Sequence, residues 1–205
     1  SYSVTGVQTC ALPISAQAPW AALPWKERSR RLGRVERLLC ERKDELADLI
    51  YRDNGKTRLD ALATELLPAA MALRYYRRRG RRFIAPKRIR GGNVLMFNKR
   101  SRLVYKPYGV VGIISPWNYP FAIPFSEVVM ALLAGNAVLL KVASDTLEVG
   151  RALAAAFDAA ELPAGLFSYV ELPGREAGPA FIEGGVDKLF FRSEEHTSEL
   201  QSPNT

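Results

Sequence analysis

The sequence has little of the chemistry that disulfide frameworks, metal sites and histidine-based triads require. Its 205 residues include two cysteines, Cys10 and Cys40, and one histidine, His196. The two cysteines are not spaced like metal ligands and are too few for a disulfide framework. A single histidine excludes a multi-histidine metal site, and the sequence indicates no histidine-based catalytic triad. We therefore expect no metal, and a reducing, cytoplasmic setting.

Long apolar runs are also missing. No stretch spans a bilayer without charged residues, and the start of the chain has neither the basic residues nor the sustained apolar core of a cleavable signal. The composition is 48% hydrophobic and 24% charged, which is ordinary for a globular protein. No membrane partner is expected.

The positive charge is concentrated in one segment. The formal net charge is +8, and Arg74–Arg90 carries many of the arginines, with Tyr75, Tyr76 and Phe83 between them. Such a segment could bind nucleic acid through phosphate contacts and base stacking. It is also typical of a solvated helix C-terminus followed by a basic loop. We favour the second interpretation, because no known nucleic-acid module surrounds the segment, and expect no nucleic-acid partner.

Helical periodicity dominates the first part of the chain. Apolar residues recur at helical spacing over Trp25–Arg52, and Gly55 is expected to end this helix. A second helix is expected over Arg58–Arg79, bent or split at Pro68. Cys40 is expected on the apolar side of the first helix, as a packing residue.

The pattern changes after Gly92. Two short β-prone runs, Val94–Phe97 and Arg102–Lys106, flank a turn-like sequence and predict a hairpin. Apolar strands and helices then alternate from Val110 to Phe191, which predicts an α/β fold with a doubly wound parallel sheet. The first strand is not followed by the G-x-G-x-x-G fingerprint of dinucleotide-binding folds.

The stretch "IISPWNYPFAIP" (113–124) places an amide at the end of a buried strand. Pro116 ends the strand and Pro120 restricts Tyr119, so Asn118 is held in a defined conformation. A held polar group at this end of a strand is where open α/β sheets bind ligands. The alternative is a turn whose asparagine caps the next helix.

Four segments in order and spacing resemble the aldehyde dehydrogenase superfamily: "YGVVGIISPWNYPFAIP", "ALLAGNAVLLKVASDT", "LPAGLFSYVELPG" and "DKLFF". The resemblance covers about residues 16–191. It implies N-terminal helices and part of a Rossmann-like sheet, with a β-hairpin from the family's oligomerisation region. It also implies a homodimer or homotetramer that oxidises a small-molecule aldehyde to a carboxylic acid with NAD or NADP.

The resemblance also assigns site residues. Asn118 matches the catalytic oxyanion-hole amide of the family. The cofactor site is expected to include Asn118 and the residues that match the family's cleft, Ile114, Ser115, Pro116, Trp117, Lys141, Ser144 and Gly174. Lys141 matches the lysine that binds the adenosine ribose, and Gly174 matches the glycine against which the adenine packs.

Ser144 bears on the choice of cofactor. Many NAD-preferring members of the family carry a glutamate at this position, which binds the ribose 2′-hydroxyl and repels a 2′-phosphate. A small hydroxyl removes that repulsion, so the resemblance favours NADP. The alternative is that Ser144 only caps the following helix.

Both ends of the chain depart from the family. Val4–Ile14 can be encoded by DNA whose complementary strand, shifted by one nucleotide, encodes Arg192–Ser202. Both segments resemble a translated sequencing adapter, so residues 1–15 and 192–205 are expected to be non-native. Residues 16–191 are then the N-terminal part of a cofactor-binding domain. The family's nucleophilic cysteine and general-base glutamate are expected to lie beyond this sequence, and the chain itself is expected to be inactive.

Two non-catalytic alternatives remain open: nucleic-acid binding through Arg74–Arg90, and a stand-alone nucleotide-binding or assembly module.

Overall fold

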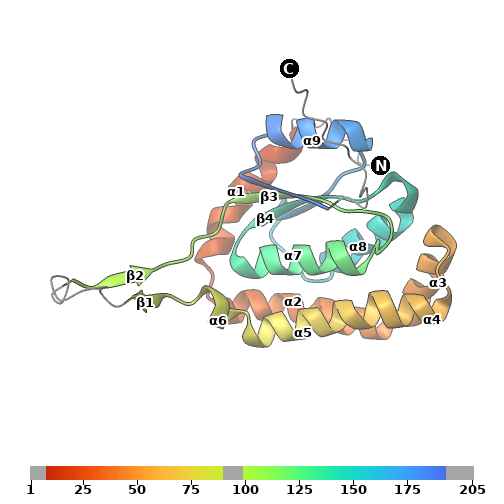
Figure 1. The fold of residues 1–205 in the computed structure, drawn as a ribbon, viewed down its shortest axis with the longest axis horizontal. Coiled ribbons are helices and arrows are strands. Elements are labelled where there is room, and N and C mark those ends of the chain that lie inside the picture. Colours follow the sequence, from red (N-terminus) through yellow and green to blue (C-terminus); the bar gives the residue numbers. More distant parts are fainter. Residues whose placement is uncertain (1–7, 90–98, 193–205) are drawn as a thin grey trace, which may run out of the picture.

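The computed structural model describes residues 8–89 and 99–192, with side chains from residue 15 onward. A parallel sheet has the order β5-β4-β3-β6 and lies between helices (Figure 1). Its strands are β3 (Val110–Ile114), β4 (Ala137–Lys141), β5 (Phe167–Tyr169) and β6 (Lys188–Phe191). The predicted α/β class with a parallel sheet is confirmed.

The two central strands are buried at every position, as their continuous apolar sequences predict. β3 pairs with β4 so that Ile114 lies opposite Lys141, and β3 pairs with β6 so that Ile114 lies opposite Phe191. The carboxyl ends of these three strands therefore share one edge of the sheet.

Helices cover both faces of the sheet (Figure 1). α7 (Ala122–Ala134) joins β3 to β4, and the short helix η3 (Ser144–Thr146) followed by α8 (Leu147–Asp158) joins β4 to β5. α9 (Gly174–Glu183) joins β5 to β6 and lies on the opposite face. α9 packs closely on β3, since a Cβ on Gly112 would lie 2.6 Å from the ring of Phe181.

A layer of helices lies beneath α7 and α8 (Figure 1). The predicted helix over Trp25–Arg52 is two helices, α2 (Trp25–Glu41) and α3 (Lys43–Asn54), separated at Arg42, whose φ of −104° and ψ of 18° are not helical. α3 ends at Gly55 in the left-handed conformation, as predicted.

The predicted second helix is split, as expected, before Pro68. It consists of α4 (Arg58–Asp60), the π-helix η1 (Ala61–Leu66) and α5 (Leu67–Arg79). In the π-helical turn the amide of Leu67 bonds to the carbonyl of Leu62. Gly80 then leads into a further short helix, α6 (Arg81–Ile84).

A small antiparallel hairpin extends from the body of the molecule (Figure 1). It pairs β1 (Lys87–Ile89) with β2 (Ser101–Leu103), so the predicted run Arg102–Lys106 forms a shorter strand that begins one residue earlier. The other predicted strand, Val94–Phe97, lies outside the described residues.

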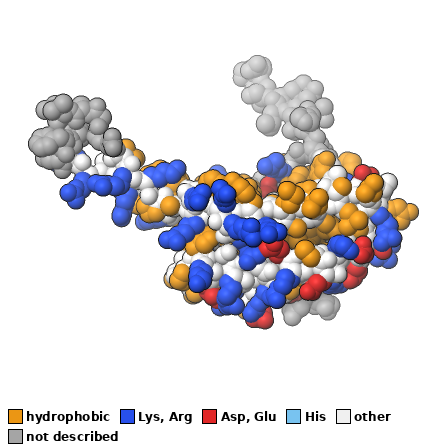
Figure 2. All heavy atoms as spheres, turned by 90° about the horizontal axis from the view of Figure 1, so that it is seen from below, with side chains coloured by type: hydrophobic (Ala, Val, Ile, Leu, Met, Phe, Trp, Pro, Cys, Tyr) orange, Lys and Arg blue, Asp and Glu red, His pale blue; other side chains and the backbone are white. Residues whose placement is uncertain are grey.

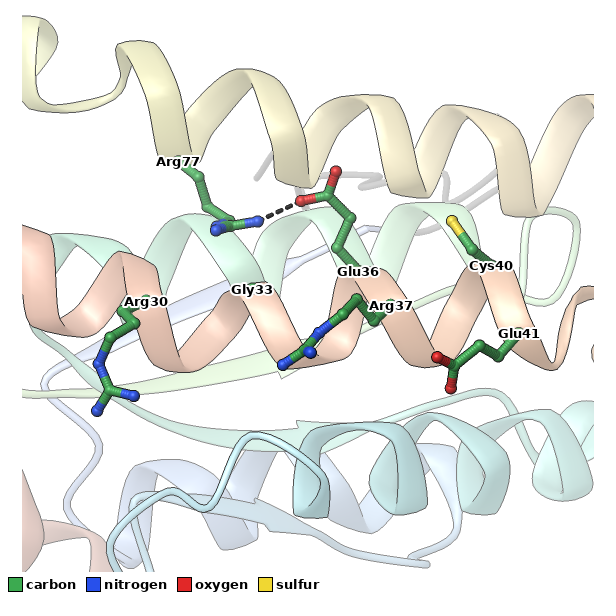
Figure 3. A pocket seen from close by; sticks show the side chains of 7 residues that line it. All are labelled: Arg30, Gly33, Glu36, Arg37, Cys40, Glu41 and Arg77. Atoms are coloured by element: carbon green, nitrogen blue, oxygen red, sulfur yellow. Dashed lines mark hydrogen bonds and ion pairs between the residues drawn. The ribbon is translucent and has the colours of Figure 1, made fainter.

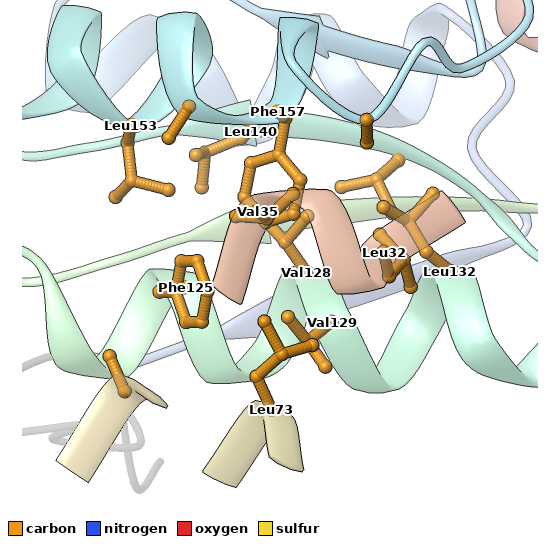
Figure 4. Packing of buried hydrophobic residues seen from close by; sticks show 14 of the residues in the cluster. Leu32, Val35, Leu73, Phe125, Val128, Val129, Leu132, Leu140, Leu153 and Phe157 are labelled. Carbon is orange, nitrogen blue, oxygen red and sulfur yellow. The ribbon is translucent and has the colours of Figure 1, made fainter. Parts of the chain in front are cut away.

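The main core fills the space between the helical layer, α7, α8 and one face of the sheet. Figure 4 shows Leu32 and Val35 of α2 near Leu132 and Val128 of α7, and Leu73 of α5 near Val129 of α7. The rings of Phe125 and Phe157 stack with centroids 5.4 Å apart and connect α7 to α8. A smaller cluster on the opposite face of the sheet includes Ile114, Leu139 and Phe181.

α1 (Gln8–Ala22) is tied to the carboxyl end of α7. Trp20 Nε1 donates to the carbonyl of Leu132 at 2.8 Å, and Gln17 Nε2 donates to that of Gly135 at 2.8 Å. The buried guanidinium of Arg28 donates to the carbonyls of Ala21 and Leu133 at 3.0 and 3.1 Å. These contacts involve residues after the expected boundary near residue 15, and that boundary stays a prediction.

The basic segment is largely solvated. Arg74, Arg78, Arg79, Arg81 and Arg82 are exposed, and Figure 2 shows Lys and Arg side chains over the helical layer and the hairpin. Within the described part of the chain, no helix combines the length and apolar character needed to cross a bilayer.

Candidate functional site

The carboxyl end of β3 and the turn after it contain five of the predicted site residues. Ile114 ends β3, and Ser115 is buried and donates its amide to the carbonyl of Lys141 at 3.0 Å. Pro116, Trp117 and Asn118 follow in the turn before α7. The ring of Trp117 is exposed, whereas Asn118 is half-buried.

This turn lies at the topological switch point of the sheet. From β3 the chain proceeds through α7 to β4 and then β5 on one side, and it returns through α9 to β6 on the other side of β3. Ligands of open α/β sheets bind in the crevice that such a reversal leaves at the carboxyl ends of the strands. The topology therefore places Ser115 and Asn118 where a ligand is expected.

Several buried polar atoms near this crevice have no hydrogen-bond partner among the described residues. They include Ser115 Oγ, Asn118 Oδ1 and Glu127 Oε2. Buried polar atoms are normally satisfied, and unsatisfied ones often mark a site that a ligand or water completes. Burial raises the pKa of Glu127, and the neighbouring Arg192, whose Nε donates to Glu127 Oε1 at 3.0 Å, opposes that rise.

Lys141 brings a buried positive charge to the same edge of the sheet. It is 5% exposed, and burial lowers the pKa of its ammonium, while Asp145 opposes the change. A Cβ built on Gly174, the first residue of α9, would lie 3.7 Å from Lys141 Nζ. The ammonium and the start of α9 provide donors and positive potential that suit a nucleotide's ribose and phosphates.

Ser144 is exposed and begins η3, three residues after the last residue of β4. No side chain from the N-cap residues of η3 or α8 makes a capping bond. Instead Asp53 Oδ2, at the end of α3, accepts from the amide of Val149 at 2.9 Å. The first turn of α8 is thus capped by another helix, and the interpretation of Ser144 as only a helix cap is not supported.

The structure therefore brings the predicted site residues together. Ile114 and Lys141 are opposite each other in the sheet, Ser115 to Asn118 follow β3, Ser144 follows β4, and Gly174 adjoins Lys141.

Sequence reasoning missed a group that holds the turn from the helical layer. Asn54, Lys56 and Glu65 contact the residues on both sides of Asn118. The sequence contained one signal for Glu65. It lies four residues from Ala61 and four from Ala69, so helical spacing places its carboxylate on the same helix face as two apolar residues, and both of these are buried in the structure.

The expectation for Cys40 is wrong. Cys40 is exposed, because it lies beside the buried side of α2, whose buried residues are Arg28, Leu32, Val35 and Leu39. It lines a hollow of about 530 Å³ between α2 and α5, which the Glu36–Arg77 ion pair crosses (Figure 3). Cys10 and His196 lie outside the described side chains. Among the described residues, no cluster of three or more His, Cys, Asp or Glu side chains is placed to hold a metal ion.

Comparison with known proteins identifies relatives over most of the chain. The model of the "Aldehyde dehydrogenase family" matches residues 9–200. A 4,4′-diapolycopene aldehyde oxidase of Methylomonas sp. is 36% identical over 172 residues, which is 84% of this chain and 32% of that protein.

Solved structures agree. A NAD-dependent benzaldehyde dehydrogenase from Corynebacterium glutamicum superposes with a TM-score of 0.74 and 33% identity over 85% of this chain and 37% of that chain. An NADP-dependent enzyme of E. coli superposes with a TM-score of 0.78 and 31% identity over 86% of this chain and 36% of that chain. The chain spans about a third of the length of the curated relatives it matches. The comparisons give no support to the nucleic-acid-binding alternative.

Proposed function

The chain belongs to the aldehyde dehydrogenase family, and from this membership we propose that the whole protein oxidises an aldehyde to a carboxylic acid, with NAD or NADP as hydride acceptor. The observation that supports it best is the position of Asn118, in a turn between two prolines at the switch point of the sheet. We further propose that this protein is a cytoplasmic homodimer or homotetramer and that the β1–β2 hairpin contributes to assembly.

Asn118 is proposed as the oxyanion donor. When a thiolate adds to the aldehyde carbonyl, the carbonyl oxygen gains negative charge, and a positioned N–H group lowers the barrier by stabilising it. The side chain of Asn118 suits this role because its amide carries N–H donors at Nδ2 and lies in the turn at the switch point of the sheet.

Lys141, Ser144 and Gly174 are proposed to hold the adenosine part of the cofactor, with Ile114, Ser115, Pro116 and Trp117 along its path. Bound NAD or NADP supplies the acceptor for the hydride that leaves the substrate. The residues present fit such a group, because a buried ammonium, a helix start and a position without a side chain adjoin one another. We propose that NADP is used at least as well as NAD, because Ser144 adds no negative charge near the ribose.

The nucleophile and the general base are proposed to come from sequence beyond this chain. Cys40 is exposed on α2, in the helical layer, and no other cysteine side chain is described. The chain as given is therefore expected not to oxidise aldehydes. We also propose that residues 1–15 and 192–205 are non-native and that residues 16–191 are the N-terminal part of the cofactor-binding domain.

The uninterrupted reading frame tests these proposals first. It is expected to continue "DKLFF" with a T-G-S turn and to encode a cysteine further on, and a frame lacking both would contradict the assignment. The full-length protein should then reduce NAD or NADP in the presence of a panel of aliphatic and aromatic aldehydes. Turnover is expected to stop when the downstream cysteine is replaced by alanine.

A further inference from the structure

Three residues of one upstream segment hold the turn that contains Asn118. Asn54 Nδ2 donates to the carbonyl of Trp117 at 2.8 Å. The ammonium of Lys56 lies 3.9 Å from the ring centroid of Tyr119. Glu65 Oε2 accepts from the amides of Phe121 and Ala122 at 3.2 and 2.8 Å. We call these three residues, Asn54, Lys56 and Glu65, the clamp. They contact residues before and after Asn118 in the sequence.

Glu65 is the central member of the clamp. Its side chain is 0% exposed, and its other carboxylate oxygen is paired with the ammonium of Lys56. A buried carboxylate is tolerated only where charge and hydrogen bonds compensate its lost hydration. Here the amides of the N-cap residue Phe121 and of Ala122, the first residue of α7, provide that compensation together with the Lys56 ammonium. The compensation depends on geometry, so it couples the position of Glu65 to the start of α7.

The π-helix η1 places this carboxylate. Glu65 lies inside the turn Ala61–Leu66, in which the bond from the Leu67 amide skips to the carbonyl of Leu62. A π-helical turn shifts the following side chains around the helix axis, and such turns occur frequently at functional sites. Two other residues of η1, Ala61 and Leu66, are buried, so packing holds the backbone around Glu65 in place.

We propose that the clamp positions the Asn118 amide, with Glu65 as its main residue. This inference rests on the proposed function of Asn118 as oxyanion donor. Such a donor must lie within about 2.7–3.1 Å of the developing oxyanion to stabilise it, so a small shift of the turn would weaken it. The clamp touches no part of Asn118 itself in the contacts described, and we therefore assign it a positioning role rather than a catalytic one.

A double-mutant cycle on the full-length enzyme tests the proposal. Asn118→Ala is expected to lower kcat by about 100- to 1000-fold. Glu65→Ala is expected to lower kcat by about 10- to 100-fold while the Kd for the cofactor changes little. Because Glu65 acts through Asn118, Glu65→Ala should cause no further loss in the Asn118→Ala background. Glu65→Gln keeps an acceptor oxygen and should recover part of the loss.

Glu36→Ala is the matched control. It removes an ion pair with Arg77 in the same helical layer, and it should lower thermal stability without lowering kcat more than about twofold. If Glu65→Ala does not fold, Asn54→Ala, which removes only the bond to the Trp117 carbonyl, takes its place in the cycle.

The outcomes distinguish a failure of the positioning role of Glu65 from a failure of the oxyanion role of Asn118. Unchanged kcat in Glu65→Ala, or an equal further loss in the Asn118→Ala background, overturns the positioning role and leaves that of Asn118 intact. Unchanged kcat in Asn118→Ala overturns the oxyanion role and the positioning role together.

Discussion

Lys141 and Gly174 adjoin each other at the carboxyl edge of the sheet, where a Cβ on Gly174 would lie 3.7 Å from Lys141 Nζ. That distance is an ordinary van der Waals contact, and Gly174 is not among the described glycines with positive φ. Neither crowding nor backbone conformation within this chain requires a glycine here. A small side chain at residue 174 is therefore expected to leave the fold intact.

We predict that Gly174→Ala and Gly174→Val weaken NADP binding progressively while the free energy of unfolding changes by no more than about 1 kcal/mol. In the proposed site, a side chain at residue 174 would occupy space that the nucleotide needs, but not space that the fold needs. Titration of the full-length enzyme with NADP, followed by fluorescence, gives the Kd values. Equal Kd values for all three proteins would remove Gly174 from the cofactor site. Lys141→Met, as a companion variant, should weaken binding through loss of its charge.

We predict that Ser144→Glu lowers NADP-dependent activity by about 1–3 kcal/mol in kcat/KM and spares NAD. The added carboxylate would repel the 2′-phosphate, whereas the exposed side chain at residue 144 has no packing to lose. Ser144→Gln, similar in size and uncharged, is the control and should keep more NADP use than the glutamate variant. Unchanged discrimination between the two cofactors would mean that another residue determines the choice.

We predict that Asn136→Ala lowers the free energy of unfolding by about 1–3 kcal/mol. Asn136 is buried; its Oδ1 accepts from the amides of Tyr108 and Gly109 at 2.7 and 3.2 Å, and its Nδ2 donates to the carbonyl of Ala131 at 3.1 Å. The substitution removes the acceptor of the Tyr108 and Gly109 amides just before β3, whereas the Ala131 carbonyl keeps its bond from the Asn136 amide. Urea denaturation measures the change, with the exposed Lys43→Ala as control. A midpoint equal to that of the control would contradict the role.

We predict a pH-dependent contribution to stability from Glu27. Hydrogen bonds from Arg30 and then Arg31 lower the pKa of its carboxyl from 4.5 to about 2. Because the pKa is lower in the folded state, the contribution is present above the unfolded value and is lost as the pH falls from about 4.5 toward about 2.

Glu27→Gln should therefore have a lower Tm than the parent protein at pH 6, and the difference should shrink as the pH falls to 3. Added salt should reduce the difference at pH 6, since the group is at the surface. Thermal unfolding followed by circular dichroism checks both effects. A Tm difference that is constant with pH would show that the carboxylate charge is not involved.

Much of the fold could be predicted because its signals are local. β3, α7, β4 and α8 follow from continuous apolar strands, helical periodicity and the glycine that ends α7, Gly135, all of which act over a few residues. The order of the family motifs predicted Asn118, Lys141, Ser144 and Gly174 as one site. Their closeness at one edge of the sheet follows from parallel strand pairing.

What sequence patterns did not predict depends on which surfaces pack together. The helical periodicity of α2 does not show how much of the helix surface is buried. The prediction that Cys40 is a packing residue was therefore wrong, because Cys40 lies just outside the buried part. The run around Arg102 predicted a hairpin strand but not its partner, Lys87–Ile89.

The contacts that organise the site are the clearest case. Glu65 and Asp53 are ordinary helix residues in the sequence, yet they bond to the amides of Ala122 and Val149, 57 and 96 residues away. Local sequence determined that α7 and α8 would form and leave amides unpaired at their first turns. Which carboxylates bond to those amides depends on how the helical layer packs against α7 and α8. Only the tertiary structure determines this, because the packed surfaces are far apart in the chain.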